Sequence, residues 1–553
     1  LVALVLGLER PLPPAVRQVL TATGTSHLFA ISGLHIGLLA AALMGVGRVI
    51  GGPSTRTKPS PWPALWALLG ATLYALLAGF TVPTQRAMCA LVVWVGARVS
   101  GREVNPARVL AIAMLAVLVW DPMAPLDAGF WLSFLAVLAL LLTRPRSTAL
   151  GVRWWWPQCV LPIALAPLVF ALFGQLSWIS PLANTVLIPV FSFVIVPVSL
   201  LGTLLLSLAP DLATPLLSVA AALLGLAMAL LERLAGMAIG SAQASVPLPL
   251  WSLVTCQLGV LVLLVRGWPG RAWAFGLCVP MLAAVFAVGR DAPPQDTVRL
   301  TVLDVGQGLA AVVETAHHAL LYDAGPSYFG AGTSAGATVV VPYLRWRGVA
   351  LLDRVVISHG DSDHAGGLDA ILAYDPAALV WQGGGPSPWP PCRTGMSWNW
   401  DGVRFEVLHP PSVQAPWHGN EGSCVLRVSV GTGAAQRRLL LTGDIQSLAE
   451  KQLLDASADA LDAHVIVAPH HGSATSSGAP FVAAVGAEVV LFAVGYANRW
   501  GFPRPAVQAR WERRGAVVGN SAIDGALTVH LQPGRPVALR RERKARRRYW
   551  SVP

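Results

Sequence analysis

The chain has 553 residues, and charged side chains make up only 12% of it, about half of the roughly 25% that soluble domains carry. Together with a mean hydropathy of +0.59, this composition excludes an ordinary soluble protein. The net charge of +11 is compatible with a polyanionic partner, but it is a weak indication because basic loops at a membrane contribute to it.

Apolar residues are concentrated in the first half of the chain. Residues 1–290 hold only 6 of the 28 acidic residues and 16 of the 39 basic ones. We therefore predict a helical membrane part followed by a soluble domain. The lead-in starts with Leu1, as a fragment or a shortened chain would. The predicted parts are a lead-in at 1–25, a polytopic membrane region at 26–290, a soluble domain at 298–533 and a basic tail at 534–553.

About ten apolar stretches of the membrane region are candidates for helices that cross a bilayer, which takes about 17 to 25 residues. Several are short, and the long stretch 180–209 contains Pro181, Pro189 and Pro197, so we expect it to be broken or to cross twice. The candidate spans are 26–47, 64–82, 86–98, 107–120, 128–143, 155–173, 180–209, 213–235, 247–265 and 271–289.

Basic residues mark alternate loops between these spans, at 48–58, 98–108, 144–153 and 266–271. The positive-inside rule places those loops in the cytoplasm. With one crossing per candidate, the last span then leaves the cytoplasm. We therefore expect the soluble domain on the outer side of the inner membrane, periplasmic or extracellular.

Polar side chains inside the spans are costly, so they are candidates for a functional path through the membrane. His27 and His35 are eight residues apart, about two helical turns, and Ser32 lies between them. Helix packing through small residues and interhelical hydrogen bonds explains this group equally well. Arg86 lies near a helix start, where a side chain that snorkels to the interface is the simpler explanation.

The densest group of metal-binding side chains follows an apolar run in the soluble domain. It consists of His359, Asp361, Asp363 and His364. Two carboxylates and two imidazoles this close repel one another unless a cation neutralises them, and both are ordinary metal ligands. The alternative is a polar loop whose aspartates cap a helix that begins near Gly366, but capping needs only one of the four side chains.

Three further predicted strands end in a metal-binding residue, at Asp323, Asp444 and the pair His470–His471. Taken singly, each of these residues is more often part of a turn. Their recurrence favours one shared site. The adjacent histidines cannot be ordered from sequence: we expect His471 to be a ligand, and His470 is either its substitute or the acid that protonates a leaving oxygen.

These segments resemble the metallo-β-lactamase fold, an αββα sandwich with a dinuclear metal site at its strand ends. The family's common motif has histidine where Asp361 stands, and the extra carboxylate makes manganese plausible beside zinc. We expect two divalent cations, with Asp444 as the bridge and Asp363, Asp444 and His470 in catalytic roles. The expected ligands are His359, Asp361, Asp363, His364, Asp444 and His471.

Four other polar residues are candidates for supporting this site. Asp304 and Asp323 are expected to orient ligands, although a strand-end turn explains Asp304 equally well. Asn420 and Ser423 are candidates for holding a substrate phosphate by hydrogen bonds, and loop structure explains them nearly as well.

Four membrane segments carry a second resemblance: HLFAISGLHIG at 27–37, TQRA at 84–87, DAGFWLSFLAVLAL at 127–140 and SPLANTVLIPV at 180–190. With LTVLDVGQGLAAVVE at 300–314, they resemble the ComEC family of competence DNA-uptake channels over most of 26–531. The resemblance implies a channel that passes single-stranded DNA across the inner membrane. It also implies a nuclease domain on the outer side that degrades the other strand.

The same resemblance implies DNA, membrane lipid and other competence proteins as partners, including a DNA receptor and a cytoplasmic ATPase. The sequence contains no G-x-x-x-x-G-K-[ST] loop, so an ATP-driven step needs another protein. The basic run 540–548 would attract DNA phosphates or anionic lipid headgroups, unless it is a solvated tail. The six cysteines show no C-x-x-C spacing; only Cys392 and Cys424 could pair outside the membrane, and no disulfide framework is implied.

Two other functions remain open from the sequence. The first is a membrane-anchored metallohydrolase of small phosphodiesters or lipids, which is weakened because anchoring needs one or two spans rather than about ten. The second is a channel whose hydrolase domain binds DNA without cleaving it.

Overall fold

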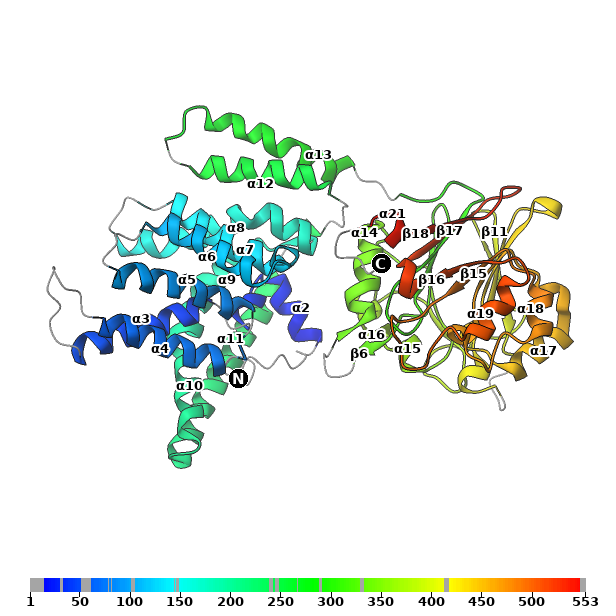
Figure 1. Cartoon of the computed structure of the whole chain (residues 1–553), viewed down its shortest axis with the longest axis horizontal. Helices are drawn as coiled ribbons and strands as arrows, with labels where there is room; N and C mark the ends of the chain where they lie inside the picture. The colour runs from blue at the N-terminus through cyan, green and yellow to red at the C-terminus, as the bar shows by residue number, and fades with distance from the viewer. Residues whose placement is uncertain are drawn as a thin grey trace. The chain divides into compact units, whose positions relative to one another are not determined.

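The computed structural model divides into two compact units, Leu1–Ala287 and Val288–Pro553, and each is described by itself (Figure 1). The division lies close to residue 290, where the composition changes. The residues described are 14–29, 33–50, 61–77, 79–80, 82–100, 105–143, 145, 149–237, 242–243, 248–265, 267–287, 291–328, 333–411 and 417–547.

The N-terminal unit is built of helices, because long apolar runs with few breakers satisfy their backbone hydrogen bonds within each segment. A short antiparallel pair joins β1 (Gln175–Leu176) to β2 (Ala242–Gln243). The helices are α2 (Pro14–Ala22), α3 (Gly33–Ile50), α4 (Trp62–Leu77), α5 (Val82–Val99), α6 (Pro106–Trp120), α7 (Ala128–Leu142), α8 (Leu150–Phe173), α9 (Ser180–Pro189), α10 (Val196–Leu205), α11 (Pro210–Met237), α12 (Leu250–Leu264) and α13 (Val279–Ala287).

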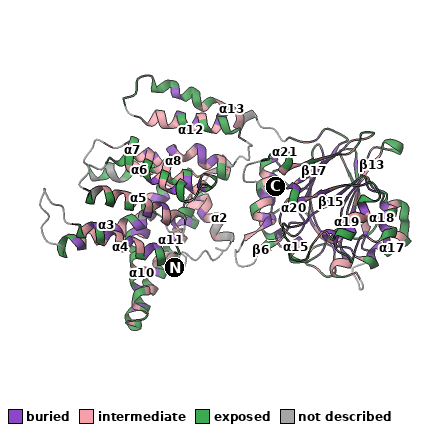
Figure 2. Ribbon diagram, in the orientation of Figure 1, coloured by how far each residue is buried: buried purple, intermediate pink, exposed green. Residues whose placement is uncertain are grey.

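Helix α4 shows how these helices distribute their side chains. Small residues such as Ala67 and Ala71 are fully buried against α3, where they let the two backbones approach closely. Leu69 and Leu73 point outward and are more than half exposed. Exposed green bands run along most helices of this unit (Figure 2). Large apolar side chains outside and small ones inside suit a hydrocarbon solvent rather than water.

Three helical segments are long and apolar enough to cross a membrane: Trp155–Phe173, Ser180–Leu205 and Pro210–Met237. The shorter apolar helices in the described part of the chain are His35–Ile50, Trp62–Leu77, Pro106–Trp120, Ala128–Leu142, Leu250–Leu264 and Arg271–Val285. The candidate at 86–98 lies in α5, which is in neither group. We expected about ten membrane crossings. Among the described residues, three helices are long and apolar enough to cross a membrane by themselves.

The stretch expected to break at its prolines forms one continuous helical run in the structure. A π-helical segment, Val190–Ile195, joins α9 to α10. Pro189 and Pro197 lie next to this segment, and a π-turn accommodates the hydrogen bonds that proline removes. The expectation of a broken or twice-crossing helix was therefore wrong for Ser180–Leu205.

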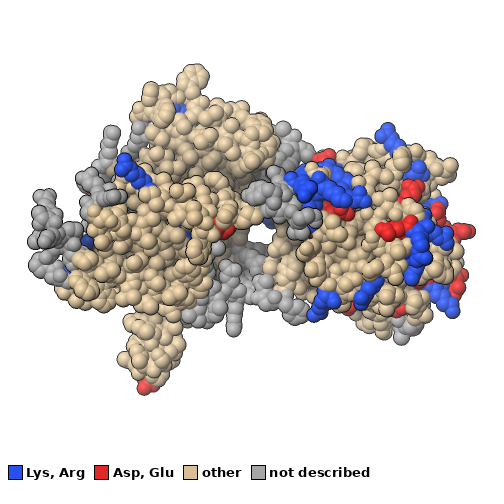
Figure 3. Space-filling view, viewed as in Figure 1, with Lys and Arg blue, Asp and Glu red and all other residues tan. Residues whose placement is uncertain are grey.

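The C-terminal unit contains two seven-stranded sheets, and charged side chains are spread over its visible face (Figure 3). The first sheet has the order β18-β17-β3-β4-β5-β8-β9, antiparallel up to β5 and parallel from β5 to β9. Its strands are β3 (Val298–Val302), β4 (Ala311–Glu314), β5 (Ala319–Tyr322), β8 (Arg354–Ile357), β9 (Val380–Gln382), β17 (Leu527–Leu531) and β18 (Ala538–Arg541).

The second sheet runs β10-β11-β12-β13-β14-β15-β16, antiparallel up to β13 and parallel from there on. A two-stranded ribbon, β6 (Ser327–Tyr328) with β7 (Thr333–Ser334), lies outside both sheets. The strands of the second sheet are β10 (Ser397–Trp400), β11 (Val403–His409), β12 (Val425–Val430), β13 (Arg437–Leu441), β14 (Val465–Val467), β15 (Val489–Phe492) and β16 (Val517–Asn520).

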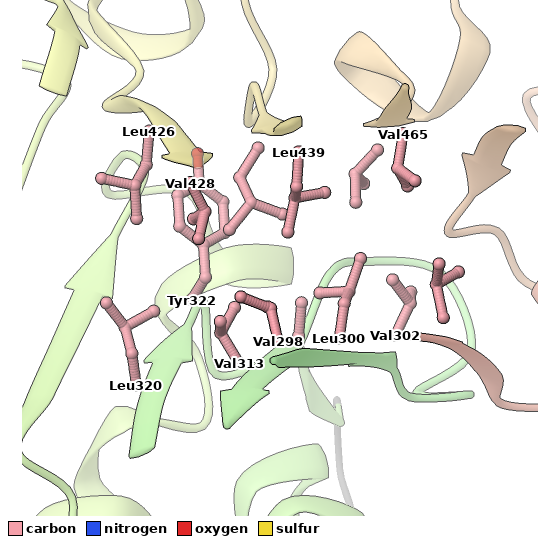
Figure 4. Close-up of a cluster of buried hydrophobic side chains, with 14 of the residues drawn as sticks. Val298, Leu300, Val302, Val313, Leu320, Tyr322, Leu426, Val428, Leu439 and Val465 are labelled. Carbon is pink, nitrogen blue, oxygen red and sulfur yellow. The ribbon is translucent and has the colours of Figure 1, made fainter. Parts of the chain in front are cut away.

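Alternation of side chains along the strands builds three apolar layers. Figure 4 shows inward residues such as Leu300 and Val313 of the first sheet facing Leu439 and Val465 of the second. Each fully buried leucine or valine contributes roughly 1.5–3 kcal/mol. The outward residues of the two sheets pack against helices.

These outer helices complete the sandwich. Helices α14 (Val341–Trp346) and α16 (Leu368–Tyr374) cover the first sheet, and α17 (Ser447–Ser457), α18 (Ala479–Val485) and α19 (Pro505–Glu512) cover the second. Short helices α15 (Ser362–Ala365), α20 (Ser521–Asp524) and α21 (Glu542–Ala545) lie in loops. The arrangement is an αββα sandwich, so the predicted fold class, a helical bundle followed by a domain of metallo-β-lactamase type, is confirmed.

The basic segment that we separated at residue 534 continues the first sheet. Strand β18 pairs with β17 in antiparallel register, and α21 follows it. Arg541 lies 3.2 Å from a carboxylate oxygen of Asp524. The domain therefore extends past 533, because a run of arginines in sequence does not reveal that some of them form an edge strand.

Candidate metal centre

The centre is built at the carboxyl ends of parallel strands, where loops from separate segments meet at one edge. Asp323 directly follows β5, and the segment 359–364 follows β8 in the same sheet. Asp444 follows β13, and His470 and His471 follow β14 in the other sheet. The two sheets of the sandwich therefore each contribute one half of the site.

Four of the predicted ligands converge on one point: Asp363, His364, Asp444 and His471 each offer a ligand atom within 4.8 Å of the others. His364 Nε2 lies 3.1 Å from Asp444 Oδ1 and 3.2 Å from His471 Nε2. His471 Nε2 lies 3.4 Å from both Asp363 Oδ2 and Asp444 Oδ2. Imidazole nitrogens that face one another and two carboxylates are the donor set of a divalent cation.

The remaining predicted ligands lie beside this cluster. His359 Nε2 is 3.5 Å from Asp361 Oδ2, and His470 Nε2 is 3.8 Å from Asp444 Oδ2. Asp361 occupies the N-cap position of α15 without a side-chain cap hydrogen bond, so helix capping does not explain it. Asp444 thus belongs to the cluster, approaches His470 and interacts electrostatically with His359, as expected of a bridging carboxylate.

Buried polar atoms without a satisfying hydrogen bond indicate whether these residues suit a bound cation. Nε2 of His359 is buried and makes no hydrogen bond within the described chain, and the buried Oδ1 of Asp444 makes none of good geometry although it lies 3.1 Å from Nε2 of His364. Burying a polar atom without a hydrogen bond costs roughly 1–3 kcal/mol. A cation would satisfy both, so the donor set fits the divalent metal that the fold implies.

Charge in the cluster is balanced by protons when no metal is bound. Burial opposes a charge on His364, but Asp444 and Asp323 outweigh it and raise its pKa well above the usual value. Burial alone would raise the pKa of Asp444, yet His364 and His471 hold it well below its usual range. A bound cation would take over this neutralising role and release protons.

Asp323 is the supporting residue that the sequence indicated. Its buried carboxylate accepts hydrogen bonds from the amide of Ser358 (2.6 Å), the hydroxyl of Ser358 (2.8 Å) and Nδ1 of His364 (2.7 Å). This contact directs Nε2 of His364 towards the cluster. His471 is oriented in the same way, because its Nδ1 donates to the carbonyl of Ala493 at 2.7 Å.

Backbone strain gathers at the same residues. Asp323, His470 and His471 have φ angles of 60°, 48° and 54°, in the left-handed region that costs non-glycine residues roughly 1 kcal/mol or more each. The turn directs the two histidine side chains differently: His471 is buried in the cluster, whereas His470 remains partly exposed beside it. The geometry thus brings His471, rather than His470, into the four-residue group.

Gly443 is required just before Asp444. Its φ of 54° lies in the left-handed region, and a Cβ at this position would stand only 2.6 Å from the Cβ of Ser358, which leaves no room for a side chain. Asp444 itself is held from the other side, because its amide donates to the hydroxyl of Ser423 at 3.1 Å.

Comparison with known proteins links this centre to the helical unit. Residues 4–270 match the model of the competence protein family, and residues 303–495 match the metallo-beta-lactamase superfamily. Competence protein ComA of Neisseria gonorrhoeae is 37% identical over 543 residues, which are 96% of this chain and 74% of that protein. The chain belongs to the ComEC-type competence protein family. The family resemblance predicted from sequence is thereby confirmed.

Two further relatives of this competence protein align over 96% of the chain. The uncharacterized protein YcaI of Escherichia coli is 31% identical over 70% of its own length. Recombination protein 2 of Haemophilus influenzae is 30% identical over 71% of its length. Membership in the family, together with the apolar helices, makes the chain a membrane protein.

Not all the supporting residues predicted for this competence protein lie at the centre. Asp304 forms an ion pair of 2.8 Å with Arg543, and among the described residues no hydrogen bond or ion pair joins it to a predicted ligand, which favours the alternative of a strand-end turn over a role in orienting a ligand. Ser423 lies at the centre, with its hydroxyl 3.5 Å from Nδ1 of His359. Asn420 is adjacent as well, because its amide nitrogen is 3.5 Å from Nε2 of His470.

Some residues at the centre were not predicted from the sequence, because only their contacts in the folded structure reveal their roles. Ser358 bonds Asp323, and its hydroxyl also lies 3.0 Å from Nδ1 of His359. Glu421 anchors the start of α17, where it accepts hydrogen bonds from three backbone amides that include Gln446 and Ala449. The disulfide between Cys392 and Cys424 was left open by the sequence and is present in the structure.

The polar residues predicted for a membrane path have different surroundings. Arg86 is buried and lies 3.2 Å from Asp127, so snorkelling to the interface does not describe it. His35 is buried in α3, and His27 lies in the turn Ser26–Leu28. Ser32 lies outside the described residues.

Proposed function

We propose that this chain is a DNA internalisation channel for natural transformation, with a metal-dependent nuclease domain that degrades one strand while the other crosses the membrane. The observation that carries the proposal is the combination, in one chain, of an apolar helical unit of the competence family with a four-ligand metal centre. A relative named Competence protein aligns with 96% of the chain and thus supports a role for both units in DNA uptake.

The residues that would hold the cations are those of the centre. Asp363, His364, Asp444 and His471 would hold one cation, and His359 with Asp361 would hold a second, towards which Asp444 also contributes its charge. Bound divalent cations would neutralise a phosphodiester and make a water molecule more acidic. The added carboxylate of Asp361 favours manganese as well as zinc.

The protein's own residues supply positioning and proton transfer. His470 lies beside Asp444 and within 3.5 Å of the Asn420 amide, next to where a leaving oxygen would depart. Burial lowers the pKa of His470, although Asp444 opposes the shift. Asn420 and Ser423 would donate hydrogen bonds to phosphate oxygens.

A polymer can reach this centre. The side chains of Asp361 and Asp363 are 59% and 37% exposed, whereas His359 and His364 behind them are fully buried. Two of the six predicted ligands therefore reach the surface, while the other four lie buried behind them. An open site suits a DNA backbone better than it suits a small phosphodiester, which gains affinity from enclosure.

The proposed location of the C-terminal unit is the outer side of the inner membrane. Basic loops in alternate positions support it, and so does the Cys392–Cys424 disulfide, because disulfides persist in oxidising compartments. In this setting we propose that a DNA receptor delivers the substrate and a cytoplasmic ATPase supplies the energy for import.

The test uses the full chain in lipid nanodiscs with labelled duplex and single-stranded DNA and either manganese or zinc. We expect cleavage that is lost in Asp444→Ala and retained in Asp304→Asn, a control acid on a neighbouring loop that pairs with Arg543. Turnover of small phosphodiesters alone would favour an anchored metallohydrolase. DNA binding without cleavage under either metal would favour a channel whose hydrolase domain has lost catalysis.

A further inference from the structure

A loop beside the metal centre exposes a group of aromatic and cationic side chains. It connects β15 to α19, and it contains Tyr496, which is 68% exposed, and Trp500, which is 41% exposed. Clustered exposed aromatic residues on a domain that has its own buried core mark an interaction surface. We call this surface the aromatic ledge, and it comprises Tyr496, Arg499, Trp500, Phe502 and Arg504.

The ledge contacts His470, which lies beside the four-residue cluster. The ring of Phe502 packs edge-on against His470, with centroids 5.8 Å apart, and it stacks on Trp500 with centroids 6.4 Å apart. The centre of the Trp500 ring is therefore at most about 12 Å from His470. Backbone bonding strengthens the connection, because the amide of Arg504 donates to the carbonyl of Gly472 at 2.9 Å.

One side chain holds the ledge in shape. Asn498 donates from its amide to the carbonyls of Gly495 (3.0 Å) and Phe502 (2.7 Å), and it accepts from the Phe502 amide at 2.9 Å. Gly495 is held in turn by Gln307, whose side-chain oxygen accepts a hydrogen bond from the Gly495 amide at 3.2 Å. The aromatic surface is thus preorganised, so a ligand does not pay the entropy of ordering it.

Cations accompany the rings. The guanidinium carbon of Arg499 lies 4.3 Å from the centre of the Trp500 ring, and that of Arg504 lies 5.9 Å from the centre of the Phe502 ring. Among the residues that the structure describes, no carboxylate lies within 4 Å of either guanidinium. Both arginines are exposed, so their charges are available to an anionic ligand.

Resting on the proposed function, we propose that the aromatic ledge binds unpaired bases of single-stranded DNA that flank the phosphodiester at the metal centre. Trp500 and Tyr496 stack on bases, while Arg499 and Arg504 contact phosphates. Aromatic faces with neighbouring cations are the chemistry of single-strand binding, whereas bases inside a duplex do not present their faces to a protein.

The spacing agrees with this ligand. His470, at most about 12 Å from the Trp500 ring centre, lies 3.8 Å from Asp444, so the ring and the cluster are within roughly five nucleotides at the 3.4 Å rise of a stacked strand, and fewer in an extended one. A base on Trp500 therefore belongs to the same short segment as the phosphate at the metals. The ledge makes the centre select DNA with an unpaired stretch next to the cleaved bond.

The experiment measures DNA binding by the full chain in nanodiscs of zwitterionic lipid, with a chelator present to prevent cleavage. The probes are labelled oligothymidine, the corresponding abasic strand and a duplex of equal length. Trp500→Ala is expected to weaken oligothymidine binding roughly 5- to 150-fold and to leave the abasic strand unaffected. Trp500→Phe is expected to retain most of the affinity.

The matched control is Trp346→Ala in α14. Trp346 is also 41% exposed and also carries an arginine, with the Arg347 guanidinium carbon 5.4 Å from the ring centre. Equal thermal unfolding of the two alanine variants establishes that both are folded. Oligothymidine affinity that is the same in both variants would overturn the inference, and so would an equal loss for the abasic strand.

Two further outcomes separate this inference from the proposed function. If the wild-type protein binds and cleaves DNA and Trp500→Ala binds DNA equally well, the proposed role of the ledge is refuted and the proposed nuclease function is retained. Wild-type protein that neither binds nor cleaves any DNA would refute both. Binding to anionic vesicles that depends on Trp500, with no effect on oligothymidine, would show the ledge to be a membrane contact and overturn the inference.

Discussion

Asp323 is expected to control metal affinity although it is not a ligand. Its carboxylate accepts three hydrogen bonds, two from Ser358 and one from His364 Nδ1. In Asp323→Asn the amide nitrogen would donate to Nδ1 of His364 instead. The imidazole proton would then move to Nε2, which lies 3.1 Å from Asp444 and faces the site where the cation binds. Asparagine has nearly the same shape and tolerates the left-handed φ of this position.

The expected loss follows from the role of such outer residues, whose replacement typically costs 10- to 100-fold in metal affinity. Because Asp323 supports His364 and also Ser358, which touches His359, we expect the upper end, about 100-fold or about 2.8 kcal/mol. Competition between the full chain and a metal-binding dye measures the affinity for zinc and manganese.

Asp304→Asn is the control, since it makes the same chemical change at an acid that contacts Arg543 instead of the ligands. Circular dichroism and thermal unfolding confirm that both variants fold. An affinity in Asp323→Asn within threefold of the wild type would refute the assignment of His364 orientation to this carboxylate.

Two further predictions concern stability. The Cys392–Cys424 disulfide closes a loop with a sequence separation of 32, so Cys424→Ser should lower the free energy of unfolding by about 3–4 kcal/mol. Dithiothreitol should destabilise the wild type but not the variant, and an equal effect on both would contradict this. Burial raises the pKa of Glu450 from 4.5 to about 7, although the Gly478 and Ser477 amides oppose the shift. The folded state therefore holds this proton more tightly than the unfolded state, and stability should fall by up to about 3 kcal/mol as pH rises from 4.5 to 7. Glu450→Gln should remove this contribution to the pH dependence. The free energy of unfolding of both proteins is measured by denaturation at pH 5 and 8, and an equal change between the two pH values in both proteins would contradict the prediction.

The ligand set was predictable because strand ends are readable from sequence. Apolar runs followed by acid or imidazole groups identify the carboxyl ends of strands, and in parallel pairs those ends meet at one edge. Asp323, Asp444 and the pair His470–His471 were expected near the segment 359–364 by that argument, and the structure brings them together there. These candidate ligands can be identified from the sequence without knowing which strands are neighbours in the sheet.

Contacts between distant segments were not predictable in the same way. Asp304 looked like a supporting residue, but its partner Arg543 is 239 positions away on a segment that reads as a loose tail. Strand β18 escaped notice for a related reason, since an edge strand lacks the alternating apolar pattern of a central one. The aromatic ledge became visible only when Phe502 was found against His470.

The helical unit shows the same division. Apolar composition predicted membrane helices, because transfer of side chains into hydrocarbon depends on residue type alone. The lengths of those helices, the π-helical turn at 190–195 and the Arg86–Asp127 pair depend on neighbouring helices that sequence does not name.

By itself, then, the sequence determined the two-part organisation, the sandwich fold, the family and the residues that are candidates for the metal centre, since each rests on local pattern or residue type. Tertiary structure alone decided which of two adjacent histidines enters the four-residue cluster, that Asp323 rather than Asp304 orients a ligand, and that exposed aromatic rings lie beside His470. These depend on backbone turns and on packing between segments far apart in the chain, and no local pattern encodes them.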